Sequence, residues 1–360
     1  MTGDVPPYMP QLDGVRALAV SLVMISHFAL LDSISALQMP GRFLGAVGVD
    51  LFFVLSGFLI TGILLAASDR TKDGERSAGT ELRHFYARRF LRIFPIYYLT
   101  IAALALAGLP SVTHYLGWHL TYLANWYVAA NPIDLFPANH FWSLAVEEQF
   151  YLVWPSLILF LPRRRLVPVV LLLCAVAIAT RFGLCLAGVH PFTIRFNTVT
   201  CLDYLALGAL LAILRREGEQ GALWLRRIAS IGLWVGTPGV VYFLATARGL
   251  DDMRYWAFAP PFVALWSAWL IERSARGAAD TLGRALATPP AVALGRVSYG
   301  VYVYHAPVLW WMNGALTQWG WNLPGTPRFL VMLAATLAVA TASWWVIERP
   351  INGLKRHFPY

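Results

Sequence analysis

The sequence predicts an all-α, polytopic integral membrane protein with about ten transmembrane helices and both termini in the cytoplasm. Three observations predict this class: a charge-poor composition, ten apolar stretches, and basic clusters in alternate connections. Hydrophobic residues make up 58% of the 360 residues and charged residues only 13%, whereas soluble domains carry about 25% charged residues. The composition therefore excludes a soluble globular protein, a disordered chain and a disulfide-rich secreted scaffold.

A transmembrane helix needs about 20 mostly apolar residues. The ten candidate stretches lie at 15–31, 46–67, 93–109, 140–161, 166–187, 198–214, 228–247, 256–271, 297–316 and 329–348. We expect them to form a single transmembrane domain over residues 1–360. The first stretch carries Arg16 and His27 and is followed by nine others, so we do not interpret it as a signal peptide.

Basic residues are retained on the cytoplasmic side during membrane insertion. Alternate connections contain basic clusters, at 70–92, 163–165, 215–227, 273–296 and 355–356. The other connections contain few basic residues, so the pattern requires an even number of spans with both ends in the cytoplasm. It also accounts for the net charge of +9, which we therefore do not assign to nucleic-acid binding.

The longest predicted outer connection, 110–139, is rich in aromatic residues. Trp118, Tyr122, Trp126 and Tyr127 suit the lipid–water interface, and a sugar-binding platform is the alternative. The three cysteines, Cys174, Cys185 and Cys201, lack metal-ligand spacing. We interpret them as small buried hydrophobic residues and expect no metal site.

The first predicted span carries three ionisable residues, Asp13, Arg16 and His27. Such groups are costly inside a bilayer and are candidates for function. Arg16 and His27 are eleven residues apart, close to three turns and about 16 Å of rise, so they share a face. Asp13 precedes Arg16 by one turn and could hold its guanidinium. A structural role, with the Asp–Arg pair closing the helix end and His27 bonded to a neighbour, fits the spacing equally well.

The fourth predicted span contains a polar stripe. Ser143, Glu147 and Tyr151 recur every four residues and share one face, whereas Glu148 and Gln149 point elsewhere. A carboxylate on this stripe needs protein or water beside it, because lipid cannot satisfy it. Serine and tyrosine also serve helix packing, but a glutamate is costly for packing alone, so we favour a functional role for Glu147.

Arginines gather before the third predicted span. Arg89 and Arg92 are one turn apart, and Arg83 and Arg88 precede them. Guanidinium groups bind phosphate oxygens through paired hydrogen bonds. Retention of basic residues on the cytoplasmic side explains the same cluster, so alone it does not identify a binding site.

Two further polar motifs lie in the ninth and second spans. Tyr302 and His305 share a face with Ser298, and we interpret this second intramembrane histidine as a packing group. Ser56-Gly57 is typical of close helix approach, and we interpret it as structural.

Together these motifs resemble the acyltransferase-3 family of membrane O-acyltransferases over nearly the whole chain. In order, they are Arg16 and His27 with ten residues between them, DLFFVLSGFLI at 50–60, Arg89-x-x-Arg92 before Ile-Phe-Pro, WSLAVEEQFYL at 142–152, Asp203 to Gly208, SYGVYVYHAPV at 298–308 and Glu348-Arg349-Pro350. One such motif is weak evidence, but the ordered set is specific.

The resemblance implies a ten-helix domain that moves acyl groups, usually acetyl, from cytoplasmic acyl-CoA to hydroxyls of sugars or lipid-linked glycans. Acyl-CoA is then a co-substrate, no cofactor is permanently bound, and we expect a bacterial cytoplasmic (inner) membrane location. Larger members often carry an esterase-like outer domain, which we do not expect here. The nearest counterparts are therefore short free-standing members that modify O-antigen, exopolysaccharide, nodulation oligosaccharides or macrolide sugars. A macrolide or other small-molecule acceptor stays open as the alternative.

On this interpretation, Arg16, Arg89 and Arg92 bind the phosphates of acyl-CoA, and the pantetheine arm runs beside the first helix toward His27. His27 is the predicted base for the acceptor hydroxyl, with Glu147 as the group that orients or charges it. Direct transfer and an acyl-histidine intermediate both stay open. The predicted supporting residues are Asp13, Ser143, Tyr151, Tyr302 and His305. The competing class is a transporter or flippase, but the sequence lacks the internal repeat that transporters more often show.

Overall fold

The computed structural model describes residues 8–30, 35–131, 135–321, 323 and 325–360, and over these ranges the chain forms helices and no strand. The all-α prediction is confirmed. The helices that cover the predicted stretches are α1 (Pro10–His27), α2 (Ser35–Lys72), α3 (Ala78–Leu106), α7 (Phe141–Phe160), α8 (Arg163–Leu186), α10 (Leu202–Leu214), α11 (Gly218–Ile231) with α12 (Thr237–Thr246), α13 (Met253–Ala275), α15 (Pro289–Gln318) and α16 (Gly325–Ser343). Residue 31, the last of the first predicted stretch, lies outside the described residues.

Shorter helical segments connect or extend these helices. They are α4 (Pro110–Thr113), α5 (Leu116–Leu120), α6 (Ala124–Ala130), α9 (Pro191–Phe196), η1 (Val199–Cys201), η2 (Gly232–Gly236), α14 (Thr281–Leu286), η3 (Trp344–Glu348), α17 (Arg349–Gly353) and η4 (Leu354–His357). Two of them, η2 and η3, are π-helical turns that join their neighbours into longer continuous helices.

Within the described part of the chain, five helical segments are long and apolar enough to cross a membrane. They are Leu37–Lys72, Ala78–Leu106, Arg163–Leu186, Gly218–Thr246 and Gly325–His357. The other predicted spans form helices as well, but they are shorter or carry more polar side chains within the apolar sequence. The chain is therefore a polytopic membrane protein, while the number of ten spans and the cytoplasmic position of both termini stay predictions.

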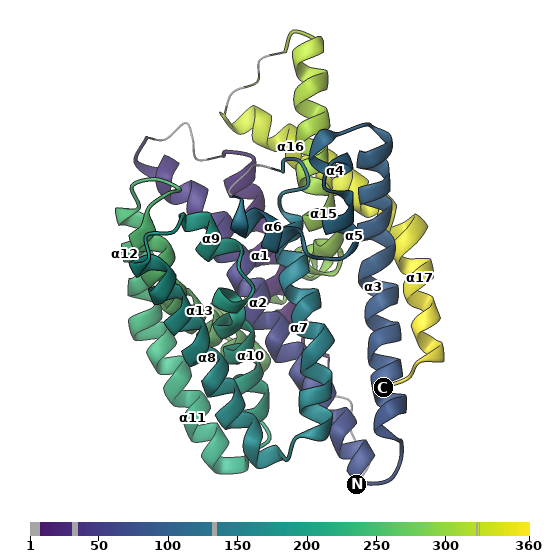
Figure 1. The fold of residues 1–360 in the computed structure, drawn as a ribbon, viewed down its shortest axis with the longest axis vertical. Coiled ribbons are helices and arrows are strands. Elements are labelled where there is room, and N and C mark those ends of the chain that lie inside the picture. The colour runs from purple at the N-terminus through teal and green to yellow at the C-terminus, as the bar shows by residue number, and fades with distance from the viewer. Residues whose placement is uncertain (1–7, 31–34, 132–134, 322, 324) are drawn as a thin grey trace.

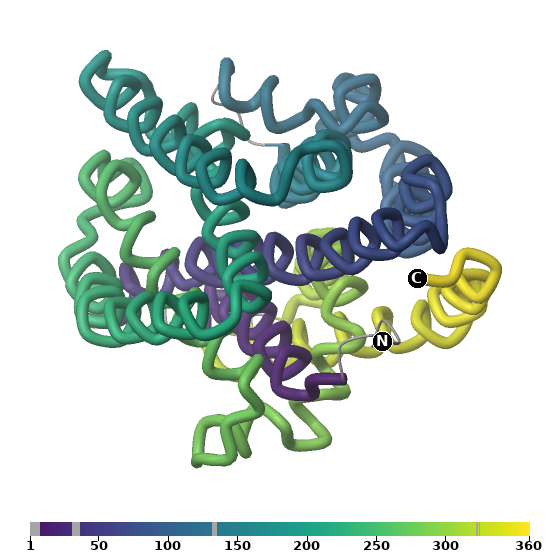
Figure 2. The backbone as a smooth tube through the Cα atoms, turned by 90° about the horizontal axis from the view of Figure 1, so that it is seen from below, coloured from purple at the N-terminus to yellow at the C-terminus, as the bar shows by residue number. Residues whose placement is uncertain are grey.

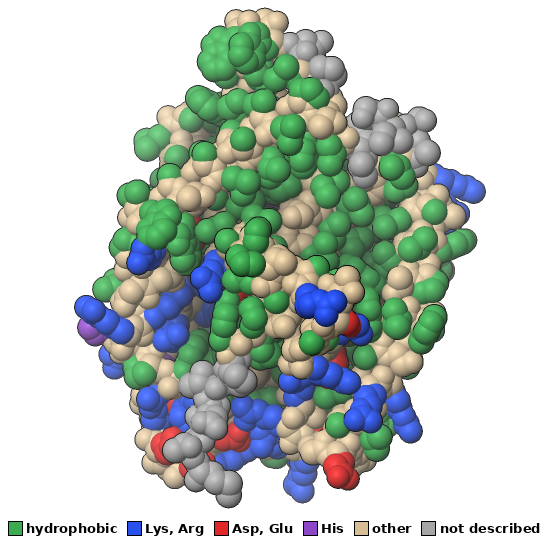
Figure 3. Space-filling view, turned by 180° about the vertical axis from the view of Figure 1, so that it is seen from behind, with side chains coloured by type: hydrophobic (Ala, Val, Ile, Leu, Met, Phe, Trp, Pro, Cys, Tyr) green, Lys and Arg blue, Asp and Glu red, His purple; other side chains and the backbone are tan. Residues whose placement is uncertain are grey.

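α1 and α2 occupy the middle of the molecule (Figures 1 and 2). Helices α8 and α10–α13 lie on one side of this pair, and α3 lies on the other side with α17 beside it. Viewed from behind, charged side chains gather toward one end of the surface and hydrophobic side chains cover most of the rest (Figure 3). This segregation is what a helical bundle needs when lipid surrounds its middle and water its ends.

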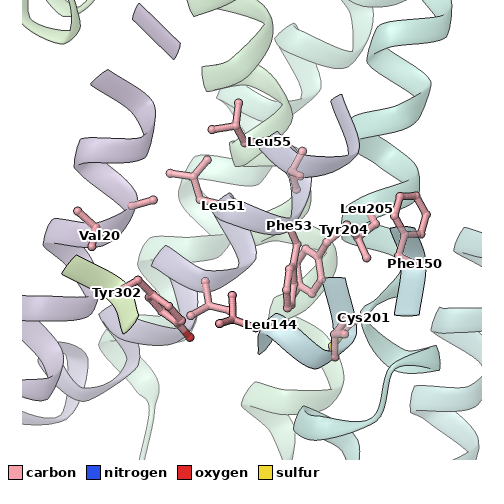
Figure 4. Close-up of a cluster of buried hydrophobic side chains, with 14 of the residues drawn as sticks. Val20, Leu51, Phe53, Leu55, Leu144, Phe150, Cys201, Tyr204, Leu205 and Tyr302 are labelled. Atoms are coloured by element: carbon pink, nitrogen blue, oxygen red, sulfur yellow. The ribbon is translucent and has the colours of Figure 1, made fainter. Parts of the chain in front are cut away.

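A close helix contact joins α2 and α10 through two glycines. A Cβ at Gly57 would lie 2.0 Å from the carbonyl oxygen of Leu205, and one at Gly208 would lie 1.9 Å from that of Val54. Neither position can carry a side chain unless the helices separate, so the predicted close approach at Gly57 is confirmed. Beside this contact, apolar side chains from α1, α2, α7, α10 and α15 form the buried core (Figure 4).

The outer connection corrects one interpretation made from the sequence. Tyr122 is buried and its ring stacks on that of Tyr97, with 4.3 Å between centroids, so it belongs to the core and not to the lipid–water interface. Trp118 and Trp126 are exposed, as both interpretations of this connection require. Residues 132–134 of the connection lie outside the described residues. The sequence misassigned Tyr122 because composition does not reveal which side chains of a connection pack inward.

Candidate active site

A cavity of about 280 Å³ lies between α1, α2, α3, α7 and α15. Seven of the ten predicted site residues line it: Arg16, Arg89, Arg92, Ser143, Glu147, Tyr151 and Tyr302. One wall is the apolar face of α2, with Phe52, Leu55 and Leu59 among its residues. The cavity therefore joins predicted site residues that are up to 286 positions apart in the sequence, from Arg16 to Tyr302.

One end of the cavity is cationic. Arg16, Arg89 and Arg92 are joined there by Arg88 and Lys355, two residues that the sequence had not assigned to a site. The predicted ion pair between Asp13 and Arg16 is formed, and Tyr8 Oη donates a hydrogen bond of 2.7 Å to the same aspartate.

Arg89 and Arg92 have no ion-pair partner among the residues that the structure describes. Arg89 instead lies over the ring of Tyr151, with 5.4 Å from Cζ to the centroid. Arg88 donates hydrogen bonds to the backbone carbonyls of Lys355 and Phe358, at 3.1 and 3.0 Å. Positive charge that is only partly exposed and not neutralised is costly, so this end of the cavity is suited to an anion.

The predicted polar stripe of α7 faces the cavity. Ser56 Oγ donates a short hydrogen bond to Glu147 Oε1, and Tyr151 Oη donates one of 2.9 Å to Ser56 Oγ. Ser56 therefore acts within the site, which corrects its interpretation as a purely structural residue. Gln149 binds the backbone carbonyl of Tyr122 on another face of α7, as its spacing predicts.

A pair of hydroxyl groups closes the other end of the cavity. Ser143 Oγ and Tyr302 Oη lie 2.6 Å apart, and Tyr302 Oη also donates a hydrogen bond of 3.0 Å to the backbone carbonyl of His140. The supporting positions predicted for Ser143 and Tyr302 thus meet at one point. The cavity changes from cationic to uncharged along its length.

Three histidines lie next to this uncharged end. Nδ1 of His27 is 2.7 Å from Nε2 of His305, and the two rings are stacked with 4.9 Å between centroids. The ring of His140, at the start of α7, lies 4.7 Å from that of His305. His140 was not among the predicted site residues, although its place directly before the polar stripe of the same span could have indicated it.

His27 lies beyond the cavity rather than in its lining. A Cβ at Gly45 of α2 would be 3.5 Å from Nε2 of His27, and Gly45 precedes the cavity residue Val49 by one turn, about 6 Å. Likewise His305 follows the cavity residue Tyr302 by one turn of α15. His27 is exposed, whereas His305 is fully buried. The two histidines therefore lie between the uncharged end of the cavity and the surface around His27, next to both.

The direct pairing predicted between His27 and Glu147 is not formed. His27 is hydrogen-bonded to His305, and Glu147 is hydrogen-bonded to Ser56. Shared depth in the bundle had suggested the pair, but α2 contributes Ser56 to Glu147 and α15 contributes His305 to His27. His305, one of the predicted supporting residues, is the hydrogen-bond partner of the predicted base, so its packing against α1 includes a polar contact.

Comparison with known proteins agrees with this arrangement. A family model described as an acyltransferase domain, of the acyltransferase-3 type, matches residues 9–345. The chain belongs to the acyltransferase-3 family. No solved structure matches it.

Two relatives illustrate the similarity. The peptidoglycan O-acetyltransferase OatA of Listeria monocytogenes is 28% identical over 98% of this chain and 57% of the relative. The O-acetyltransferase OatA of Staphylococcus aureus is 28% identical over 96% of this chain and 58% of the relative. The chain thus spans less than two thirds of the length of these relatives.

Membership in the family confirms the predicted resemblance. The chain contains an acyltransferase domain of this family. It is also an integral membrane protein, and its relatives are bacterial, in agreement with the predicted location in a cytoplasmic membrane. The residues that hold its donor and acceptor have to be argued from the cavity itself.

Proposed function

We propose that this acyltransferase moves an acyl group, acetyl in the first instance, from cytoplasmic acyl-CoA to a hydroxyl of a surface or lipid-linked glycan. The observation that carries the proposal is the cavity with one cationic end, one apolar wall and one end closed by hydroxyl groups. Acyl-CoA has the same order of chemistry along its length: phosphates, an uncharged pantetheine arm and a thioester. A translocation pathway for an anion would not require its cations to be confined to one end.

The phosphates of the donor would bind at Arg16, Arg89 and Arg92. Guanidinium groups suit this task because they donate paired, charge-assisted hydrogen bonds to phosphate oxygens. The pantetheine arm would lie along the face of α2 that contains Phe52 and Leu55. The thioester then reaches the end of the cavity that Ser143 and Tyr302 close.

The acceptor would approach His27 from the exposed side. A hydroxyl becomes nucleophilic at neutral pH when a base accepts its proton within about 2.6–3.2 Å, and the exposed imidazole of His27 can serve as that base. The relatives support an acetyl group and a glycan acceptor, since they are named O-acetyltransferases and one is named for peptidoglycan. A carbohydrate hydroxyl is therefore the acceptor that we expect.

The proposal is tested with purified protein in lipid nanodiscs supplied with isotope-labelled acetyl-CoA. We expect the wild-type protein to release CoA and to esterify a glycan acceptor, and His27→Ala to do neither while still binding CoA. Uptake or flipping of a solute with no thioester cleavage would contradict the proposal and favour a transporter. Thioester cleavage with transfer to a macrolide sugar but no glycan would change the acceptor and keep the donor.

Arginine variants test the donor site separately. CoA binding measured by calorimetry should weaken in Arg89→Ala and Arg92→Ala, because both side chains line the cavity. Arg83→Ala is the matched control: Arg83 lies on the same helix but is exposed and outside the cavity. Equal losses in all three variants would mean that the cluster acts only as a topology signal.

A further inference from the structure

We propose that His305 is a positioning residue that fixes the tautomer of His27 and so makes Nε2 of His27 the atom that accepts the proton of the acceptor hydroxyl. The inference rests on the proposed function and deepens it. It names the reacting atom and the residue that prepares this atom.

His305 is fully buried in α15, and both of its ring nitrogens have a partner. Nδ1 lies 2.5 Å from the backbone carbonyl oxygen of Tyr302. A carbonyl oxygen can only accept a hydrogen bond, so Nδ1 of His305 carries a proton. No carboxylate among the described residues is hydrogen-bonded to His305, and a buried charge without a partner is costly. His305 is therefore neutral, and its Nε2 carries a lone pair.

The tautomer of His27 follows from this result. Nε2 of His305 must accept, so Nδ1 of His27, 2.7 Å away, must donate. A neutral His27 then carries its only proton on Nδ1 and a free lone pair on Nε2. Without His305, a neutral His27 could also adopt the other tautomer. In that tautomer Nε2 is protonated and cannot act as a base.

Nε2 of His27 faces α2 at a position without a side chain. Gly45 occupies that position, and a Cβ there would lie 3.5 Å from Nε2. His27 as a residue is exposed. On the opposite side, His140 donates from Nε2 to the backbone carbonyl of Val303 at 3.0 Å and packs its ring against His305. One side of the pair is thus fixed by packing, and the other meets a glycine of α2.

The transfer step balances with these roles. The hydroxyl oxygen of the acceptor bonds to the acyl carbon while its proton moves to Nε2 of His27, and the C–S bond of the thioester breaks. The thiolate of CoA then takes the proton from Nε2. During the step the imidazolium keeps its Nδ1–H hydrogen bond to Nε2 of His305, which stabilises the charge.

Substitutions at His305 test the role through kinetics. In a catalytic triad, loss of the group that fixes the histidine tautomer lowers kcat about 10⁴-fold. We expect His305→Phe, which keeps a ring but no acceptor, to lower kcat by at least about 10²-fold with KM for acetyl-CoA unchanged. His305→Gln retains a carbonyl that can accept from His27 and should recover part of this loss, whereas His305→Lys can only donate and should not. Equal kcat in His305→Gln and His305→Lys, or wild-type kcat in His305→Phe, would overturn the inference.

The matched control and a spectroscopic measurement complete the test. His114→Phe makes the same substitution at an exposed histidine outside the cavity and should keep wild-type kcat. The protein is labelled with ¹⁵N-histidine, and the His27 signals are assigned by their loss in His27→Gln. We expect Nδ1 of His27 to be protonated and Nε2 to be unprotonated. His305→Phe should reverse or mix this pattern. A protonated Nε2 in neutral wild-type His27 would overturn the inference whatever the activity. Absence of acyl transfer in protein with the expected tautomer would instead overturn the proposed function.

Discussion

Two regions of the helical body contain arginines. They differ in whether carboxylates of the protein form ion pairs with these arginines. In the region between α2, α8, α9 and α10, Arg181 lies 2.9 Å from Asp203, and Arg195 lies 2.5 Å from Asp50. All four side chains are buried. The ring of Trp142 also lies 4.7 Å from Cζ of Arg195. Each of these four charged side chains therefore has an ion-pair partner within the protein.

The cavity region is different. It brings together Arg16, Arg88, Arg89, Arg92 and Lys355, and of these only Arg16 forms an ion pair with a described residue. Folding gains nothing from cations that repel one another, so a ligand has to compensate for them. The comparison teaches that buried arginine by itself does not identify a site. The cavity is distinguished by four cations without an ion-pair partner among the residues that the structure describes.

The largest effect is expected at the histidine beyond the cavity. Removing a general base lowers the rate about 10²–10⁴-fold, so His27→Ala should lose acyl transfer to this extent. CoA affinity should not change, because the cationic end is intact. Steady-state kinetics with calorimetry of CoA binding measures both. A variant that kept its turnover would place the chemistry elsewhere in the cavity region.

A substitution in the region of the ion pairs between α2, α8, α9 and α10 should lower the stability of the protein rather than its affinity for the ligand. Asp50→Asn leaves Arg195 buried without its partner, which costs about 3–5 kcal/mol. Thermal unfolding in detergent should show this loss, while the remaining folded protein binds CoA normally. The control is Asp252→Asn, whose partner Arg254 is exposed and whose ion pair should contribute less than about 1 kcal/mol. Weaker CoA binding without lower stability in Asp50→Asn would erase the distinction between the regions.

Arg92→Ala should give the opposite result. Loss of one hydrogen bond to a charged phosphate costs about 1.5–3 kcal/mol, or about ten- to a hundredfold in affinity. Stability should stay the same or rise, because a cation that repels its neighbours has been removed. Binding and unfolding are measured on the same preparation, with Arg83→Ala beside it. A clear loss of stability would mean that Arg92 has a structural partner.

The smallest effect is expected for Glu147→Gln. The glutamine keeps the shape and can still accept from Ser56, but it replaces a charge-assisted hydrogen bond with a neutral one. We expect a loss of kcat of about tenfold, from about 1.5 kcal/mol. A loss as large as that of His27→Ala would show that Glu147 acts with His27 during the reaction, despite their separate hydrogen bonds in this structure.

Much of the site could be predicted from sequence because it depends on helix periodicity. The stripe of Ser143, Glu147 and Tyr151 shares a face in any α-helix, and all three residues line the cavity. The pairing of Arg16 with Asp13 is a contact within one turn, and it is formed. Such relations follow from 3.6 residues per turn and need no knowledge of neighbouring helices.

Other relations could not be predicted in this way. Ser56 was assigned to packing and His305 to a structural role, yet the first binds Glu147 and the second binds His27. Each of these contacts joins residues at least 91 positions apart. Spacing within a helix shows which residues share a face, but it does not show which helix that face meets.

The sequence by itself therefore determined the helical membrane class, the positions of the helices and the residues on their polar faces, because apolar content and periodicity are local properties. Only the tertiary structure decided that the arginines of α1 and α3 share one cavity while Arg181 and Arg195 are neutralised. It also decided that His27 is bonded to His305 and not to Glu147. The physical reason is that hydrogen bonds and ion pairs act over about 3 Å, and only the packing of helices distant in sequence brings two side chains that close.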